Sequence, residues 1–194
     1  MLWGEEHDIT AVEIVPHIAE TYRKMFPNDT VIVGDAHEYL LNHYREFDYI
    51  WSSPPCPTHS RMNRVNEGMG RQIKYPDMTL YQEIILLQHH FKGQFAVENV
   101  IPYYKPLICP TIELHRHYFW TNFVVTRKYI DKGYKGWHNH GVTNLTREQL
   151  AEAYKIDLPE GTLEARKLLR NAVVPELGLH VFNCRDNLKQ EVLL

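Results

Sequence analysis

The strongest constraint on the fold of this chain is the alternation of strand-like and helix-like segments in its first hundred residues. Apolar runs of strand length begin at residues 8, 29, 47 and 93, and segments with apolar residues at helical spacing lie between them. Such alternation is typical of a parallel sheet covered by helices. We therefore predict an α/β fold, in which ligands bind at the carboxyl ends of the strands.

Beyond residue 100 the sequence no longer shows this regular alternation of strand-like and helix-like segments. Residues 103–141 mix short strand-like pieces with a turn-rich segment that carries aromatic and basic side chains. Residues 145–156 are predicted to form an amphipathic helix with Thr146 as its N-cap. Residues 162–182 are predicted to be helical, with an interruption at Pro175. We therefore predict that the middle of the chain leaves the sheet and forms a separate segment.

Composition narrows the classes of protein to consider. With 194 residues, 44% of them hydrophobic, the chain is long enough for one globular domain with a core. A net charge of -3 gives no global basic field, so contact with nucleic acid requires a local patch. Three cysteines without CxxC spacing indicate reduced thiols and a cytoplasmic location. The apolar runs are too short for a membrane span, and the histidines lack the cysteine partners of a metal site.

Candidate chemistry lies where the apolar runs end. Glu13, Asp35 and Glu98 each end or closely follow such a run, and Cys56 lies just past another, in the segment WSSPPCPTHS. The prolines of this segment restrict the backbone on both sides of Cys56, and a rigid loop can hold a thiol aimed at a substrate. A buried structural cysteine in a proline-rich turn is the alternative.

A cysteine and a carboxyl group in one crevice suit one reaction especially well. Carbon 5 of cytosine is a poor nucleophile until a thiolate adds at carbon 6, and an acid that interacts with ring nitrogen 3 helps this addition. Cys56 and Glu98 would fill these two roles.

In three ordered motifs, the sequence resembles the DNA (cytosine-5) methyltransferases, in particular the short phage-type members. PPCPTHS resembles the Pro-Cys nucleophile loop of that family, ENV its acid motif, and RNAVVP its segment near the carboxyl end. TAVEI and VGDA are weaker matches to its cofactor-binding strands, and LHRHYFWTNF resembles the region that carries its pocket arginines. The resemblance covers nearly the whole chain.

This resemblance implies a Rossmann-like fold and S-adenosylmethionine as the methyl donor. It implies transfer of the methyl group to a cytosine flipped from double-stranded DNA, as in phage or bacterial restriction-modification. Residues 1–100 and 170–194 would form the catalytic domain, and residues 101–169 a short DNA-recognition insertion. The implied catalytic residues are Cys56, Glu98 and Arg116, and the implied cofactor-binding residues are Glu13, Asp35, Pro54 and Asn171. The candidate DNA-binding residues are Ser60, Arg61, Arg64, Lys132, Lys135 and Trp137.

The sequence departs from the family pattern at several points. It begins downstream of the strand and glycine loop with which the family opens, so we expect the first strand of the sheet to be missing. The chain would then be a fragment, or a second chain would complete it. Pro57 replaces the usual glutamine, Arg170 the usual glycine, and His117 stands where a family arginine is expected, which makes Arg116 a hypothesis.

Two other functions remain open at this stage. The chain could be a catalytically silent or split methyltransferase-like protein that binds DNA or another protein. It could also be an enzyme similar to thymidylate synthase, which uses a Pro-Cys nucleophile on a free pyrimidine nucleotide, although the ordered ENV and NAVVP motifs argue against that reading.

Overall fold

The computed structural model describes residues 4, 6–128 and 145–191. The chain divides into two compact units, one of Met1–Ala36 with Lys128–Asn183 and the other of His37–Arg127 with Cys184–Leu194. Both units contain helices and strands, so the predicted α/β class is confirmed as a mixed α/β structure. The boundaries of these units differ from the predicted domain boundaries. The division into a catalytic domain and a DNA-recognition insertion therefore stays a prediction.

The first unit contains a β-α-β step. β1 (Thr10–Glu13) pairs in parallel with β2 (Thr30–Val33), and α1 (Pro16–Met25) connects them. Pro16 favours the start of α1, because the first helical position needs no backbone N–H. The Arg23 side chain ties α1 to β2 by donating to the Val31 carbonyl at 3.0 Å.

Among the described residues of this unit, three further helices begin. α6 (Arg147–Tyr154) starts at Thr146, whose side chain accepts from the backbone N–H of Gln149 in a capping box, as the sequence predicts. α7 (Ala165–Asn171) and α8 (Pro175–Glu191) form the predicted helical stretch. The helix is interrupted between them, and Pro175 is the first residue of the second helix. None of the helices in the described ranges is long and apolar enough to cross a membrane.

The second unit contains a four-stranded mixed sheet in the order β3-β4-β6-β5. Its strands are β3 (Tyr49–Ser52), β4 (Gln94–Val100), β5 (Ile112–Leu114) and β6 (His117–Thr121). β3 and β4 are parallel, whereas β6 is antiparallel to both β4 and β5. The pairing of β3 and β4 is the parallel arrangement that the alternation in the first hundred residues predicts. β5 and β6 lie beyond that region, where a two-residue turn at positions 115–116 folds them into an antiparallel hairpin.

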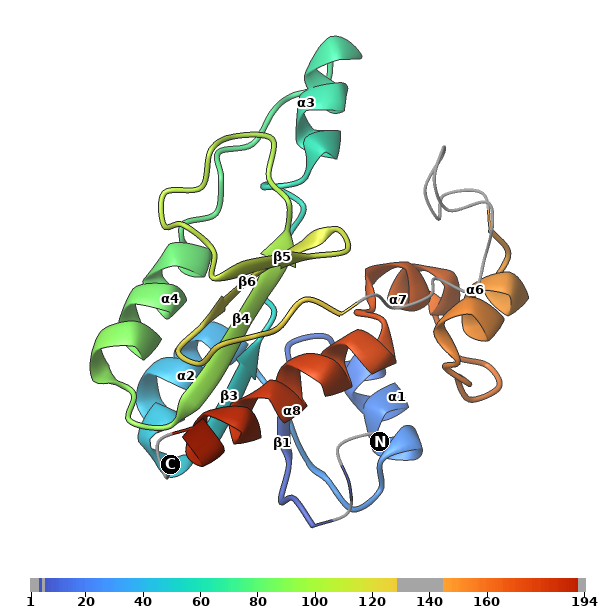
Figure 1. Ribbon diagram of the computed structural model, residues 1–194. Coiled ribbons are helices and arrows are strands. Elements are labelled where there is room, and N and C mark those ends of the chain that lie inside the picture. Colours follow the sequence, from blue (N-terminus) through green and yellow to red (C-terminus); the bar gives the residue numbers. More distant parts are fainter. Residues whose placement is uncertain (1–3, 5, 129–144, 192–194) are drawn as a thin grey trace. The chain divides into compact units, whose positions relative to one another are not determined.

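Helices cover this sheet and supply its core. The unit contains α2 (Ala36–His43), the short 3-10 helix Tyr44–Glu46, α3 (Arg61–Gly68) and α4 (Thr79–His90). Figure 1 shows α4 alongside the sheet, and Ile84 and Leu87 of α4 are fully buried in one cluster with strand residues such as Trp120. Glu83 on the same helix is also buried, where it accepts a hydrogen bond from Ser52 at the end of β3. This packing fixes the end of β3, where the candidate loop begins.

Candidate active site

The loop that carries Cys56 is fastened to the neighbouring strand. Pro54 is buried, and its carbonyl accepts a hydrogen bond of 2.9 Å from the side-chain amide of Asn99 on β4. The Cys56 carbonyl accepts from the backbone N–H groups of His59 and Ser60, both at 3.0 Å. These bonds close a compact turn, so Cys56 is held by hydrogen bonds as well as by the prolines beside it.

The far end of the loop is tied to the segment that follows β4. Ser60 forms an antiparallel bridge with Pro102, and the Tyr103 N–H donates to the His59 carbonyl at 3.1 Å. The His59 ring is 1% exposed, and its Nδ1 lies 2.5 Å from the hydroxyl of Tyr104. The loop is thus attached to β4 at one end and to the chain just beyond β4 at the other.

Glu98 lies within β4, near its carboxyl end, in the strand that the sequence predicts from residue 93. It is the fifth of the seven residues of β4. β3 ends at Ser52, opposite Val97, so Glu98 is the first β4 residue beyond the parallel pairing with β3. That position places its side chain beside the start of the Cys56 loop, and the Ser53 side chain hydrogen-bonds to it.

The environment of Glu98 favours its protonated form. Only 7% of the residue is exposed, and burial raises the pKa of its carboxyl group to about 7, against the opposing effects of the Ser53 hydrogen bond and the Arg116 charge. A carboxyl group with this pKa can donate a proton at neutral pH. Glu98 therefore has the property that a general acid requires.

Cys56 shares this electrostatic environment. Burial raises the pKa of its thiol and the charge of Glu98 raises it further, whereas Arg116 lowers it. The residue is half-buried. With its pKa raised, the thiol is protonated at neutral pH, and a neutral Glu98 and the charge of Arg116 both favour its ionisation.

Arg116 reaches the site from the β5–β6 hairpin. The turn that carries it begins at His115, which adopts a left-handed backbone with φ of 56°. His117, which follows Arg116, starts β6, and its Nε2 lies 3.4 Å from Oε1 of Glu98. Burial, with the charges of Arg116 and His115, lowers the pKa of His117 to about 4, so its ring is neutral at pH 7.

The structure thus brings together the three predicted catalytic residues and adds contacts that the sequence reading missed. Ser53 and His117 contact Glu98, and Asn99 holds the loop through Pro54. Asn99 belongs to the ENV motif, which could have identified it. The contact of His117 with Glu98 depends on how β6 pairs with β4, which no local pattern gives.

Two of the predicted cofactor residues lie at the carboxyl end of the β1–β2 pair. Glu13 is the last residue of β1 and is paired with Val33, and Asp35 follows β2 by two residues. Oε1 of Glu13 accepts from the Val15 N–H at 2.8 Å, which orients the carboxylate. Asn171, the last residue of α7, belongs to the same unit, whereas Pro54 belongs to the other.

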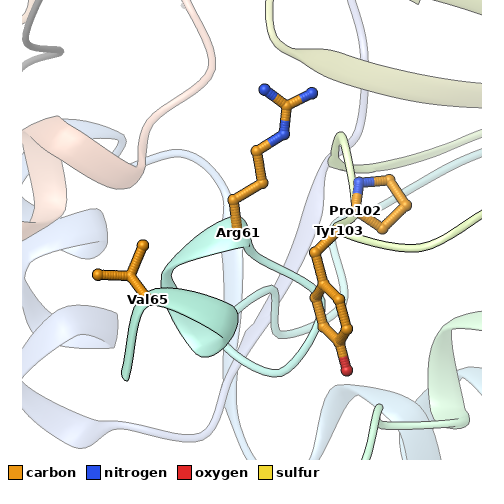
Figure 2. Close-up of a pocket in the computed structure, with 4 residues that line it drawn as sticks. All are labelled: Arg61, Val65, Pro102 and Tyr103. Carbon is orange, nitrogen blue, oxygen red and sulfur yellow. The ribbon is translucent and has the colours of Figure 1, made fainter. Parts of the chain in front are cut away.

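The predicted DNA-binding residues are described in part. Ser60 immediately precedes α3, and Arg61 is its exposed first residue. Arg61, Val65, Pro102 and Tyr103 line a hollow of about 540 Å³. Figure 2 shows these four side chains. Arg64 lies in α3, but its side chain is outside the described part, as are residues Lys132, Lys135 and Trp137 altogether.

No group of three or more histidine, cysteine or acidic side chains that could hold a metal ion occurs among the described residues.

Two comparisons with known proteins bear on this site. The family model for C-5 cytosine-specific DNA methylase matches residues 6–103, the region that carries Cys56 and Glu98. The Type II methyltransferase M1.HphI of Haemophilus parahaemolyticus is 31% identical over 104 residues, a match that covers 48% of this chain and 26% of that protein. The chain thus spans about a quarter of the length of this curated relative.

Proposed function

Because this chain belongs to the C-5 cytosine-specific DNA methylase family, we propose that it transfers a methyl group to carbon 5 of cytosine in DNA through a covalent adduct with Cys56. The observation that carries the proposal is the shared environment of Cys56, Glu98 and Arg116, in which each charge affects the pKa of a catalytic group. The proposal covers the activity, the substrate and the partners of the whole protein.

Each residue of the site has a defined task in the reaction. The Cys56 thiolate adds to carbon 6 of a cytosine that is flipped out of the duplex, while protonated Glu98 donates to ring nitrogen 3. The electron pair displaced from the 5,6 double bond makes carbon 5 nucleophilic. Carbon 5 would take the methyl group of S-adenosylmethionine, which would leave as S-adenosylhomocysteine. Solvent would then take the carbon 5 proton, the carbon–sulfur bond would break to release the Cys56 thiolate, and the proton on ring nitrogen 3 would return to Glu98. Arg116 stabilises the thiolate before addition, since its charge lowers the pKa of Cys56.

The carboxyl end of the β1–β2 pair fits the methyl donor. Carboxylates at the ends of adjacent parallel strands are suited to bind the hydroxyl and amino groups of a nucleoside. Glu13 and Asp35 would hold S-adenosylmethionine there, and Pro54 and Asn171 complete the proposed binding set. A Rossmann-like sheet and a cytoplasmic location belong to the same proposal.

Double-stranded DNA is the proposed partner. Ser60 and Arg61 lie where the Cys56 loop meets the start of α3, and there they could contact the phosphates that flank a flipped base. Arg64, Lys132, Lys135 and Trp137 would extend this contact, with the insertion of residues 101–169 reading the DNA sequence.

The test is covalent trapping on duplex DNA that contains 5-fluorocytosine, in the presence of S-adenosylmethionine. Fluorine blocks the final elimination, so an active enzyme stays attached to the DNA. We expect an adduct from the unaltered chain and from Cys109→Ala, in which an exposed cysteine is removed, but none from Cys56→Ala. A parallel sample receives the amino-terminal strand and glycine loop of the family as a separate polypeptide.

Each outcome of this test has a distinct meaning. An adduct that requires the added polypeptide would mean that this chain is a fragment or one half of a split enzyme. An adduct that persists in Cys56→Ala would overturn the assignment of the nucleophile. If no sample is trapped on DNA of varied sequence but binding to DNA is retained, the catalytically silent reading replaces the proposal.

A further inference from the structure

His117 and Glu98 meet as diagonal neighbours across two antiparallel strands. In the register of β4 and β6, Glu98 pairs with Phe119 and Val100 with His117. All four side chains share one face of the sheet, and diagonal neighbours on a face come within reach when the side chains are long. The observed distance of 3.4 Å between Nε2 and Oε1 joins an imidazole and a carboxyl group that are 6% and 7% exposed.

The imidazole has one N–H to offer in this contact. The ring is neutral at pH 7, so one of its nitrogens is a donor and the other an acceptor. A carboxylate oxygen only accepts hydrogen bonds, so contact with ionised Glu98 selects the tautomer that carries its hydrogen on Nε2. Nδ1 is then an acceptor, and this buried atom has no hydrogen-bond partner among the described residues.

Other groups also face the Glu98 carboxyl group. The Ser53 side chain hydrogen-bonds to it from the loop, the Arg116 charge acts from the hairpin turn, and the Cys56 thiol is coupled to it electrostatically. His115 acts on His117 from the same turn. Ser53 belongs to the loop that must accept a substrate, whereas His117 is anchored in the sheet. The histidine is therefore the contact that can orient Glu98 independently of the loop.

We infer that His117 is a positioning residue for the acid of the proposed reaction: its Nε2–H donates to Oε1 of Glu98, which leaves Oε2 to carry the proton toward the base. The role of the proton rests on the proposed function, whereas the pairing of the two side chains does not. A histidine thus orients Glu98 at the position where the family resemblance expects an arginine. Unlike an arginine, a neutral histidine holds the carboxyl group without adding a charge that would ionise it at neutral pH.

The test compares His117→Phe with His117→Gln, because glutamine keeps an N–H donor and phenylalanine does not. NMR titration of the Glu98 carboxyl carbon needs neither DNA nor methyl donor. We expect a midpoint near pH 7 in the unaltered chain, where the pKa of Glu98 is raised to about 7. Loss of the donor destabilises the carboxylate, so His117→Phe should move this midpoint to about pH 8, a tenfold change, and His117→Gln should leave it within about 0.3 of the original.

Two further readouts complete the test. The ring nitrogen shifts of His117 should report hydrogen on Nε2 above the Glu98 midpoint. In the trapping assay, His117→Phe should slow adduct formation about tenfold with unchanged DNA affinity, and His117→Gln should recover most of that rate. The backbone amide spectrum of each variant verifies that it is folded.

The inference is overturned if His117→Phe leaves the Glu98 midpoint unchanged, or if the hydrogen resides on Nδ1 while Glu98 is ionised. If the midpoint moves as expected but the unaltered chain traps no DNA, the pairing of His117 with Glu98 stands and the proposed function fails. The two conclusions are thereby separated.

Discussion

Burial makes Glu98 costly for folding above neutral pH, and this cost can be measured. Its pKa is raised from 4.5 to about 7. An acid whose pKa is higher in the folded state contributes stability that is fully present below the unfolded pKa and is lost as the pH rises through the folded value. A difference of about 2.5 in pKa corresponds to about 3 kcal/mol.

Glu98→Gln removes this titration while keeping the size of the side chain and an oxygen that accepts from Ser53 and His117. Between pH 5 and pH 8, the unaltered protein should lose about 2.5 kcal/mol of unfolding free energy relative to the variant. Urea unfolding at several pH values measures the difference, with tryptophan fluorescence as the signal, because Trp120, one of the four tryptophans, is buried in the same sheet.

A matched control separates this effect from general charge effects. Glu113 is an exposed carboxylate on β5, so Glu113→Gln should change the pH dependence little. His117 has a lowered pKa and costs stability as the pH falls below about 6.5, but it is present in both proteins and largely cancels in the comparison. A Glu98→Gln variant whose stability follows that of the unaltered chain from pH 5 to pH 8 would refute a raised pKa at Glu98.

Two other substitutions test how the loop is activated and held. Arg116→Ala should raise the pKa of Cys56, because the Arg116 charge lowers it, and should slow alkylation of Cys56 at pH 8 by about threefold, measured by mass spectrometry of the modified peptide with the exposed Cys109 as internal reference. Asn99→Ala should cost about 1–3 kcal/mol, because it leaves the buried Pro54 carbonyl without its donor, and urea unfolding that gives the same free energy for both proteins would contradict this role.

The secondary structure was largely predictable because its signals are local. The apolar runs that begin at residues 8, 29, 47 and 93 contain β1, β2, β3 and β4, and the helical spacing between them gives α1, α2 and α4. The N-cap at Thr146 was also predictable, because a capping box involves only four consecutive residues. The antiparallel half of the sheet was not, because the direction of β6 depends on a partner strand more than fifteen residues away.

The candidate site shows the same division between local and long-range information. Cys56 and Glu98 could be paired from their motifs, because the chemistry of the two side chains is complementary. The burial that gives Glu98 its raised pKa, and the contact with His117, follow from strand pairing that the motifs do not contain. For this reason the sequence could place Glu98 near the end of a strand but not show that it is buried there.

The rigidity of the Cys56 loop has a broader cause than the sequence alone suggests. Its prolines restrict the backbone locally, but they do not place the loop relative to the acid. Placement comes from β4: Asn99 holds the loop through the Pro54 carbonyl, and its neighbour Glu98 projects from the same strand. Successive residues of a strand point to opposite faces, so the hydrogen bond to the loop does not occupy the face that carries Glu98 and His117. One short strand thus positions the nucleophile and the acid together, and a change that shifts β4 should disturb both.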